Sequence, residues 1–183
     1  MNPPKLLIDD TVEISPFCTI GQDGFYYKRD EKGKLIKGEH KFGVILHKDV
    51  YLGAHVNVAR GRWRDTEIGE GTKVDTFAQI SHNVVIGKHN IIATHATILG
   101  SVTIGDNCDV WSNCVIHQGI TIGNNCVISA NEFVKEDVPD KHIYIGGRVF
   151  RNLKMGKKVE KKEGGVSMKS DCLNGKCGKN TDW

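Results

Sequence analysis

The sequence of 183 residues has no long apolar run and no strong excess of either charge. Residues 1–10 (MNPPKLLIDD) lack the basic region and apolar run of a signal peptide, and no segment approaches the ~20 apolar residues of a membrane span. We therefore expect a cytoplasmic protein with no membrane span. The 25 Lys and Arg nearly balance the 22 Asp and Glu, so the net charge of +3 gives no reason to expect nucleic acid.

The six cysteines show no two-residue spacing typical of a metal knuckle. Cys172 and Cys177, with four residues between them, lie in a segment, 154–179, that holds eight lysines against three acids and almost no large apolar residues. Such a composition cannot bury a core. We predict that 148–183 is a C-terminal arm followed by a disordered, lysine-rich tail, and we predict no metal site; the role of the two tail cysteines stays open.

What the sequence does have is a repeat of six residues. A β-branched apolar residue stands at every sixth position from 68 to 134. These positions are Ile68, Val74, Ile80, Ile86, Ile92, Ile98, Ile104, Val110, Ile116, Ile122, Ile128 and Val134. The dipeptide Ile-Gly also recurs every eighteen residues, at 68, 86, 104 and 122. Six residues per side and eighteen per turn predict a triangular coil of short parallel strands, a parallel β-helix.

Eight of the positions that come four residues after these large ones hold smaller residues, and we expect the smaller residues to point inward as well. Three of them are Cys108, Cys114 and Cys126, which we interpret as filler for tight corners rather than as redox groups. The repeat extends back through Leu46, Leu52 and Val58, and further to Ile8, Ile14 and Ile20. The β-helical domain is therefore predicted to cover 1–147, closing near Gly147.

Two irregularities interrupt the repeat. The interval from Val58 to Ile68 is ten residues, which we interpret as a corner tightened from the twelve of two hexads, around RGRWRD. The polar, Gly-rich segment 22–43 does not fit the coils, so we predict a loop ejected from the stack. Loops on a rigid scaffold are common places for binding residues.

A prism filled with Ile and Val leaves no internal pocket, so a ligand must bind on a side, at a corner or between chains. Flat sides suit closed cyclic assembly, and we expect a homotrimer. At one corner His82 comes two residues after Ile80, and the position one coil later is Gly100. Strands ~4.8 Å apart would place the imidazole beside a backbone N–H that no side chain covers. A base beside such a donor suits acyl transfer, although a polar residue at a corner needs no catalytic role.

The remaining histidines give weaker indications of a catalytic or metal-binding role than His82 does. His89 and His95 fall at corners with no partner that the sequence identifies. His117 lies two coils from His82, too far for both to bind one metal ion within a single chain. A zinc lyase of the γ-carbonic anhydrase type, an alternative on this fold, needs histidines that converge between subunits. The usual His-x4-His pair is absent, because His89 and His95 have five residues between them.

The ordered set of motifs IGxDGF, RGxxxDTxIG, D-x6-H-N and GS, over about residues 14–145, resembles the UDP-3-O-acylglucosamine N-acyltransferases of lipid A synthesis, within the hexapeptide acyltransferases. The resemblance implies an all-β, left-handed parallel β-helix and a homotrimer with active sites between chains. It also implies that His82 is the general base, Asp75 its orienting carboxylate and Gly100 the oxyanion donor.

The chain departs from that family in three places. Gly119 stands where the family usually has a second histidine. The N-terminal uridine-binding domain of about a hundred residues is missing, so we expect a truncated member of the family. The lysine-rich tail replaces the helical C-terminal part that meets acyl carrier protein. Arg148 and Arg151, in GGRVFR, are candidates for binding the phosphates of CoA, with a solvated arm as the alternative.

The function that these features predict is transfer of an acyl group from a thioester, carried by acyl carrier protein or CoA, to the amine of a nucleotide-linked amino sugar. The alternatives are an acetyl-CoA-dependent N- or O-acetyltransferase of another sugar, a γ-type carbonic anhydrase-like zinc protein, and a non-catalytic scaffold. The thioester is a co-substrate, and no metal cofactor is expected.

Overall fold

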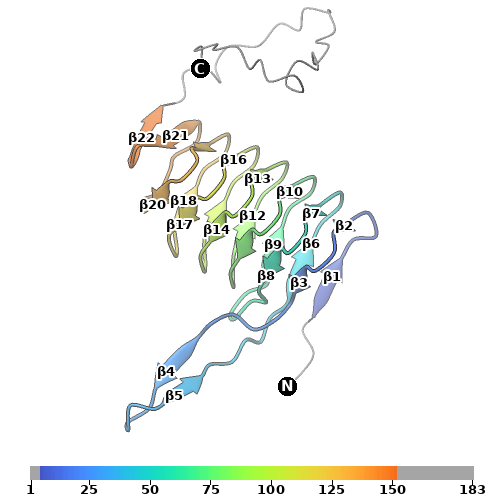
Figure 1. Cartoon of the computed structure of the whole chain (residues 1–183), viewed down its shortest axis with the longest axis vertical. Coiled ribbons are helices and arrows are strands. Elements are labelled where there is room, and N and C mark those ends of the chain that lie inside the picture. The colour runs from blue at the N-terminus through green and yellow to red at the C-terminus, as the bar shows by residue number, and fades with distance from the viewer. Residues whose placement is uncertain (1–4, 152–183) are drawn as a thin grey trace, which may run out of the picture.

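The computed structural model describes residues 5–151 (Figure 1). This range contains strands and turns but no helix, and therefore no helix that is long and apolar enough to cross a membrane. Three parallel sheets form the sides of a prism, and a separate two-stranded sheet projects from it.

Each side of the prism is one sheet whose strands come from successive coils. Sheet A contains β1 (Leu6–Ile8), β6 (Val44–Leu46), β9 (Thr66–Ile68), β12 (Val85–Ile86), β15 (Thr103–Ile104) and β18 (Thr121–Ile122). Sheet B contains β2 (Glu13–Ile14), β7 (Tyr51–Leu52), β10 (Lys73–Val74), β13 (Ile91–Ile92), β16 (Asp109–Val110), β19 (Val127–Ile128), β21 (His142–Ile145) and β22 (Arg148–Arg151). Sheet C contains β3 (Thr19–Ile20), β8 (Asn57–Val58), β11 (Gln79–Ile80), β14 (Thr97–Ile98), β17 (Val115–Ile116) and β20 (Phe133–Val134).

The prediction of a left-handed parallel β-helix is confirmed. Strand pairing between successive coils is parallel and in register, with Ile68 beside Ile86 and Ile86 beside Ile104, eighteen residues apart. The hexad residues are buried because alternation within each strand turns the second residue inward. Burying one such side chain stabilises the fold by about 1.5–3 kcal/mol, so twelve in register account for a continuous core.

The smaller residues four positions later also point inward. Cys108, Cys114 and Cys126 have no exposed surface, and Cys108 Sγ donates to the carbonyl of Gly123 at 3.0 Å. The corners are turned by residues with positive φ, many of them asparagines such as Asn107 and Asn125. Asparagine tolerates this left-handed region better than most side chains, which explains its recurrence in the repeat.

The two irregular corners are both on the edge between sheets C and A. The first follows β3 and contains 21–43, whose strands β4 (Tyr27–Arg29) and β5 (Leu35–Lys37) form an antiparallel hairpin that projects from the stack (Figure 1). The second lies between β8 and β9. Val58 pairs with Ile80 in sheet C, and Ile68 pairs with Ile86 in sheet A, so the ten residues cover a single step of six.

The prediction of a tightened corner around RGRWRD is therefore wrong, because the corner is four residues longer than a regular one. The extra residues bulge outward and are tied to their surroundings. Asp65 Oδ1 accepts from the N–H of Gly43 at 2.6 Å, and the N–H of Gly61 donates to the carbonyl of Gly43 at 3.0 Å. Both irregular corners are thus joined beside the same edge of the prism.

At the other end β22 turns back and pairs antiparallel with β21, on the outermost strand of sheet B. Tyr144 in β21 is fully buried and donates through its hydroxyl to the carbonyl of Phe133 at 3.1 Å. This arm covers a strand edge that would otherwise present unpaired backbone groups. The predicted arm begins at residue 148, and the predicted tail, including Cys172 and Cys177, lies outside the described residues.

Candidate active site

The edge between sheets C and A carries the candidate site. Val58, Ile80 and Ile98 are paired neighbours in sheet C, so the residues two positions later, Arg60, His82 and Gly100, follow one another up the edge. The structure thus brings together His82 and Gly100, two of the residues predicted from the sequence.

The His82 imidazole is held between two glycines. A Cβ built on Gly100 would lie 2.7 Å from His82 Cε1, and a Cβ on Gly24 would lie 2.9 Å from His82 Cδ2. Such distances are too short for any side chain, so both positions must be glycine for the ring to stay where it is. Gly24 belongs to the IGxDGF motif, and this contact gives the second glycine of the motif a physical role.

Asn83 favours one tautomer of the neutral ring. Its Oδ1 accepts from the backbone N–H of Arg62 at 2.7 Å and from that of Trp63 at 3.1 Å. Its Nδ2 therefore faces His82 Nδ1, 2.8 Å away, and donates to it. Because Nδ1 accepts, the proton of the neutral imidazole lies on Nε2.

Two aromatic neighbours enclose the rest of the ring. His40 and Trp63 contact His82 edge to face, with ring centroids 5.6 and 5.9 Å away. Burial lowers the pKa of His82, and the nearby His40 and Arg62 lower it further. The imidazole therefore remains neutral at a lower pH than an exposed histidine does.

Gly100 offers its backbone to a reacting group. Among the described residues, no protein group accepts a hydrogen bond from the Gly100 N–H, whereas its carbonyl accepts from the N–H of Gly119 at 3.0 Å. An unused N–H beside a neutral imidazole is the arrangement that stabilises an oxyanion next to a proton-transferring group.

Asp75 lies elsewhere. It follows β10 at the corner between sheets B and C, is exposed, and has its Oδ1 bonded to the N–H of Thr76 at 2.7 Å. His82 follows β11 at the next corner of the same coil. Within one chain, therefore, the structure does not bring the predicted orienting carboxylate to His82, and Asn83 occupies Nδ1 instead.

The predicted CoA-binding residues are also distant. Arg148 and Arg151 are exposed on β22, four strand pairings from β13 in the coil of Gly100, or roughly 19 Å at ~4.8 Å per strand. Gly119, which has a φ of 77°, has nothing within 4 Å of the position its Cβ would take. In residues 5–151, no group of three or more His, Cys, Asp or Glu side chains is placed to hold a metal ion.

The corner histidines have partners that the sequence did not reveal. His55 stacks between Phe17 and Phe77 along the edge between sheets B and C, with centroids 5.0 and 4.8 Å away. The ring of His95 lies tilted against Phe77 on the same edge, with centroids 5.1 Å apart. The ring of His89 packs over Gly71. His117 contacts Phe133 edge to face at 5.8 Å.

Sequence reasoning missed four residues of the site: His40, Gly24, Asn83 and Trp63. Gly24, Asn83 and Trp63 lie inside the motifs quoted above. The sequence therefore contained these residues, but nothing in it indicated what each of them contacts. His40 has no such signal, because it lies in the inserted segment, where the repeat assigns no neighbours.

Comparison with known proteins identifies the repeats that carry the candidate site. The model described as bacterial transferase hexapeptide (six repeats) matches residues 65–100, and that described as hexapeptide repeat of succinyl-transferase matches 101–135. The UDP-3-O-acylglucosamine N-acyltransferases of Methylorubrum populi and Rhizobium meliloti are each 47% identical over 83 residues, 45% of this chain. The match spans only 23% of the length of those relatives.

Solved structures show the same fold at lower identity. The UDP-N-acetylglucosamine acyltransferase of Bacteroides fragilis superposes with a TM-score of 0.64 at 20% identity, covering 85% of this chain and 66% of that one. The acyltransferase of the same name from Francisella novicida gives 0.67 at 20% identity, covering 75% and 49%. The resemblance to hexapeptide acyltransferases is therefore confirmed over the repeats, and the likeness of fold extends over most of the chain.

Proposed function

We propose that this chain carries the acyl-transfer site of an N-acyltransferase acting on a nucleotide-linked amino sugar. The observation that carries the proposal is the His82 ring, neutral and held between two glycines, beside an unused backbone N–H on Gly100. The relatives named above support the reaction type, and the name UDP-3-O-acylglucosamine N-acyltransferase supports an acceptor of the glucosamine class.

In this proposal the sugar amine attacks the carbonyl carbon of a thioester. The new C–N bond forms, the C–S bond breaks, and the amine proton passes through His82 to the departing sulfur, giving an amide and a thiol. The Gly100 N–H stabilises the oxyanion of the tetrahedral intermediate. The donor is a thioester of acyl carrier protein or of CoA. In CoA the long pantetheine arm separates the thioester from the phosphates, so Arg148 and Arg151, roughly 19 Å along the stack at ~4.8 Å per strand, stay candidates for binding those phosphates.

Proton transfer through His82 Nε2 requires that this atom be free to accept. Asn83 favours the opposite tautomer, with the proton on Nε2. A base at Nε2 therefore needs an acceptor for the proton on Nδ1. The carboxylate proposed for this role, Asp75, would have to come from a neighbouring chain, which is one reason to propose a homotrimer with the site between chains.

The test is an assay of thiol release by the full chain, with acetyl-CoA and hydroxyacyl-acyl carrier protein as donors and UDP-linked amino sugars as acceptors. We expect release that depends on the acceptor, and a loss of about 10²–10⁴-fold in kcat/KM for His82→Ala. His89→Ala, at a comparable corner outside the site, is the matched control and should retain the rate. No acceptor-dependent release, or a His82→Ala protein as active as the parent, would overturn the proposal.

A further inference from the structure

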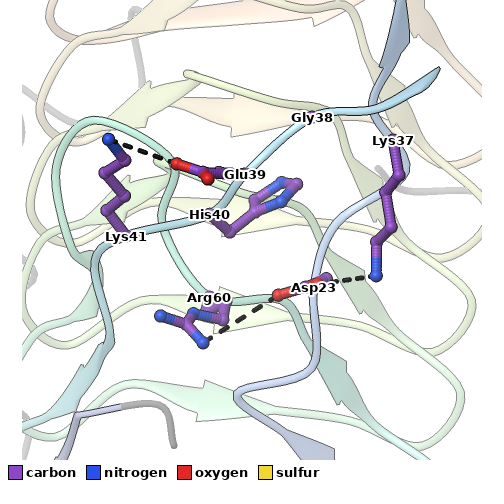
Figure 2. Close-up of a pocket in the computed structure, with 7 residues that line it drawn as sticks. All are labelled: Asp23, Lys37, Gly38, Glu39, His40, Lys41 and Arg60. Atoms are coloured by element: carbon purple, nitrogen blue, oxygen red, sulfur yellow. Dashed lines mark ion pairs between the residues drawn. The ribbon is translucent and has the colours of Figure 1, made fainter. Parts of the chain in front are cut away.

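A cavity of about 530 Å³ lies between the inserted segment and the lengthened corner, and one of its lining residues, His40, contacts His82. It is lined by Asp23, Lys37, Gly38, Glu39, His40, Lys41 and Arg60 (Figure 2). Its volume falls within the range of about 300–1,000 Å³ that is usual for sites of small molecules. All of the lining residues except Arg60 come from the inserted segment.

The most informative group in this lining is His40. The side chain is 7% exposed, and neither ring nitrogen has a hydrogen-bond partner among the described residues. Gln22 Oε1, in the same segment, is the third buried polar atom in this condition. A buried polar atom left without a partner costs about 1–3 kcal/mol, so a ligand that supplied the missing hydrogen bonds would recover that cost.

The chemistry of the lining indicates the class of ligand. Asp23 pairs with Lys37 Nζ at 2.6 Å and lies 3.9 Å from Arg60 Nη1, and Glu39 pairs with Lys41 at 3.2 Å (Figure 2). Lys37 and Arg60 thus lie beside Asp23, and Lys41 lies beside Glu39, so a phosphate placed here would meet cations that are already paired with carboxylates. Burial lowers the pKa of His40, which leaves a neutral ring with one donor and one acceptor. Hydroxyl groups, which both donate and accept, suit such a lining better than a phosphate.

The cavity is also placed for the reaction. The His40 and His82 rings meet edge to face, and the same point, where a Cβ on Gly24 would be, is 2.9 Å from both His40 Nε2 and His82 Cδ2. A ring held by its hydroxyls against His40 would have another substituent within reach of His82.

We infer that this cavity is the subsite for the hydroxyl-bearing ring of the acceptor sugar, and that His40 hydrogen-bonds to a sugar hydroxyl through a ring nitrogen. The inference rests on the proposed function for the identity of the acceptor, but the binding of a sugar ring can be measured without any turnover. His40 is in this sense a specificity-determining residue, separate from the proton transfer assigned to His82.

The first test uses ligand-observed saturation-transfer NMR on the full chain with free glucosamine. We expect saturation of the ring protons in the parent protein, a signal at least about threefold weaker in His40→Ala, and partial recovery in His40→Gln, whose amide keeps one donor and one acceptor. His47→Ala is the matched control, because His47 is a partly exposed histidine paired with Glu67 on sheet A, and it should leave the signal unchanged.

The second test uses steady-state kinetics with whichever acceptor is turned over. His40→Ala should raise KM for the acceptor about tenfold and leave KM for the thioester unchanged. Glucosamine binding that does not depend on His40, displacement of glucosamine by inorganic phosphate at equal concentration, or a rise in the thioester KM instead would overturn the inference. If glucosamine binding depends on His40 but no acceptor is turned over, the subsite stands and the proposed function fails.

Discussion

The regular coils and the two irregular corners of this molecule are built on different principles. In the coils from β9 to β20, an inward Ile or Val recurs every six residues and pairs with its counterpart eighteen residues away. In the corners at 21–43 and 59–65, no periodicity is present and the positions are set by individual hydrogen bonds, such as that between Gly43 and Asp65. The coils supply His82 and Gly100, and the corners supply the groups that surround them. The periodic part of the sequence therefore forms the scaffold, and the two segments that depart from the period contribute the residues that surround the candidate site.

The largest difference between the two regions should be in stability. Ile104 is 1% exposed in the core of the coils, so Ile104→Ala should lower the free energy of unfolding by about 2–5 kcal/mol. Ile36 is 47% exposed in the β4–β5 hairpin, and Ile36→Ala should cost less than about 1 kcal/mol. Urea unfolding at a fixed protein concentration measures both. Equal losses would mean that the hairpin is as integral to the cooperative unit as the coils are.

The next prediction concerns the contact between the two regions. Gly24→Ala places a methyl group 2.9 Å from both His40 Nε2 and His82 Cδ2, so the imidazole must move. We expect kcat/KM to fall by about 10–100-fold with little change in the unfolding midpoint. The control is Gly33→Ala in the same segment, where the φ of 77° costs some backbone strain but no atom lies within 4 Å. A Gly24→Ala protein with the parent rate would show that the ring position is not critical.

A smaller effect should follow from Asn83→Asp. A carboxylate at this position would accept from His82 Nδ1, raise the pKa of His82 and free Nε2 to take a proton. If His82 is the base, kcat/KM at neutral pH should stay the same or rise severalfold. Asn113→Asp, at a corner on another edge, is the control. A fall of tenfold or more in a folded Asn83→Asp protein would instead indicate that His82 acts by donating from Nε2.

The smallest effect should appear in the dependence of rate on pH. Burial, His40 and Arg62 lower the pKa of His82, so the acid limb of kcat/KM should lie below the usual histidine value of about 6.5. The same shift affects stability. Above that value the ring is neutral in both states, but as the pH falls below it the unfolded chain takes up a proton before the folded chain does, and stability falls. In His40→Gln the limb should move upward; a limb already at or above 6.5 in the parent protein would contradict the shift.

The sequence predicts the regular coils well and the two irregular corners poorly. The sequence predicts the positions of Ile68, Ile86 and Ile104, because strand alternation and the stacking of coils leave only one place for each side chain. The proximity of His82 to Gly100 follows from the same arithmetic. His40 could not be placed, because the number of residues in an inserted segment says nothing about where its middle lies. The ten residues from Val58 to Ile68 were misread for the same reason, since a spacing alone does not tell a shortened pair of steps from a lengthened single one.

The pairing of β1 with β6 tolerates a long insertion between the two strands. Leu6 of β1 pairs with Val44 of β6, 38 residues later. The next strand of sheet A, β9, still pairs with β6 in parallel, as it would if the usual eighteen residues separated β1 from β6. Twenty additional residues therefore leave the pairing intact, because the inward side chains, and not the length of the connection, decide which strands meet. A corner of this scaffold can accept, lose or exchange a segment without rebuilding the coils, so the recognition of a new substrate requires only a local insertion beside an imidazole that stays in place.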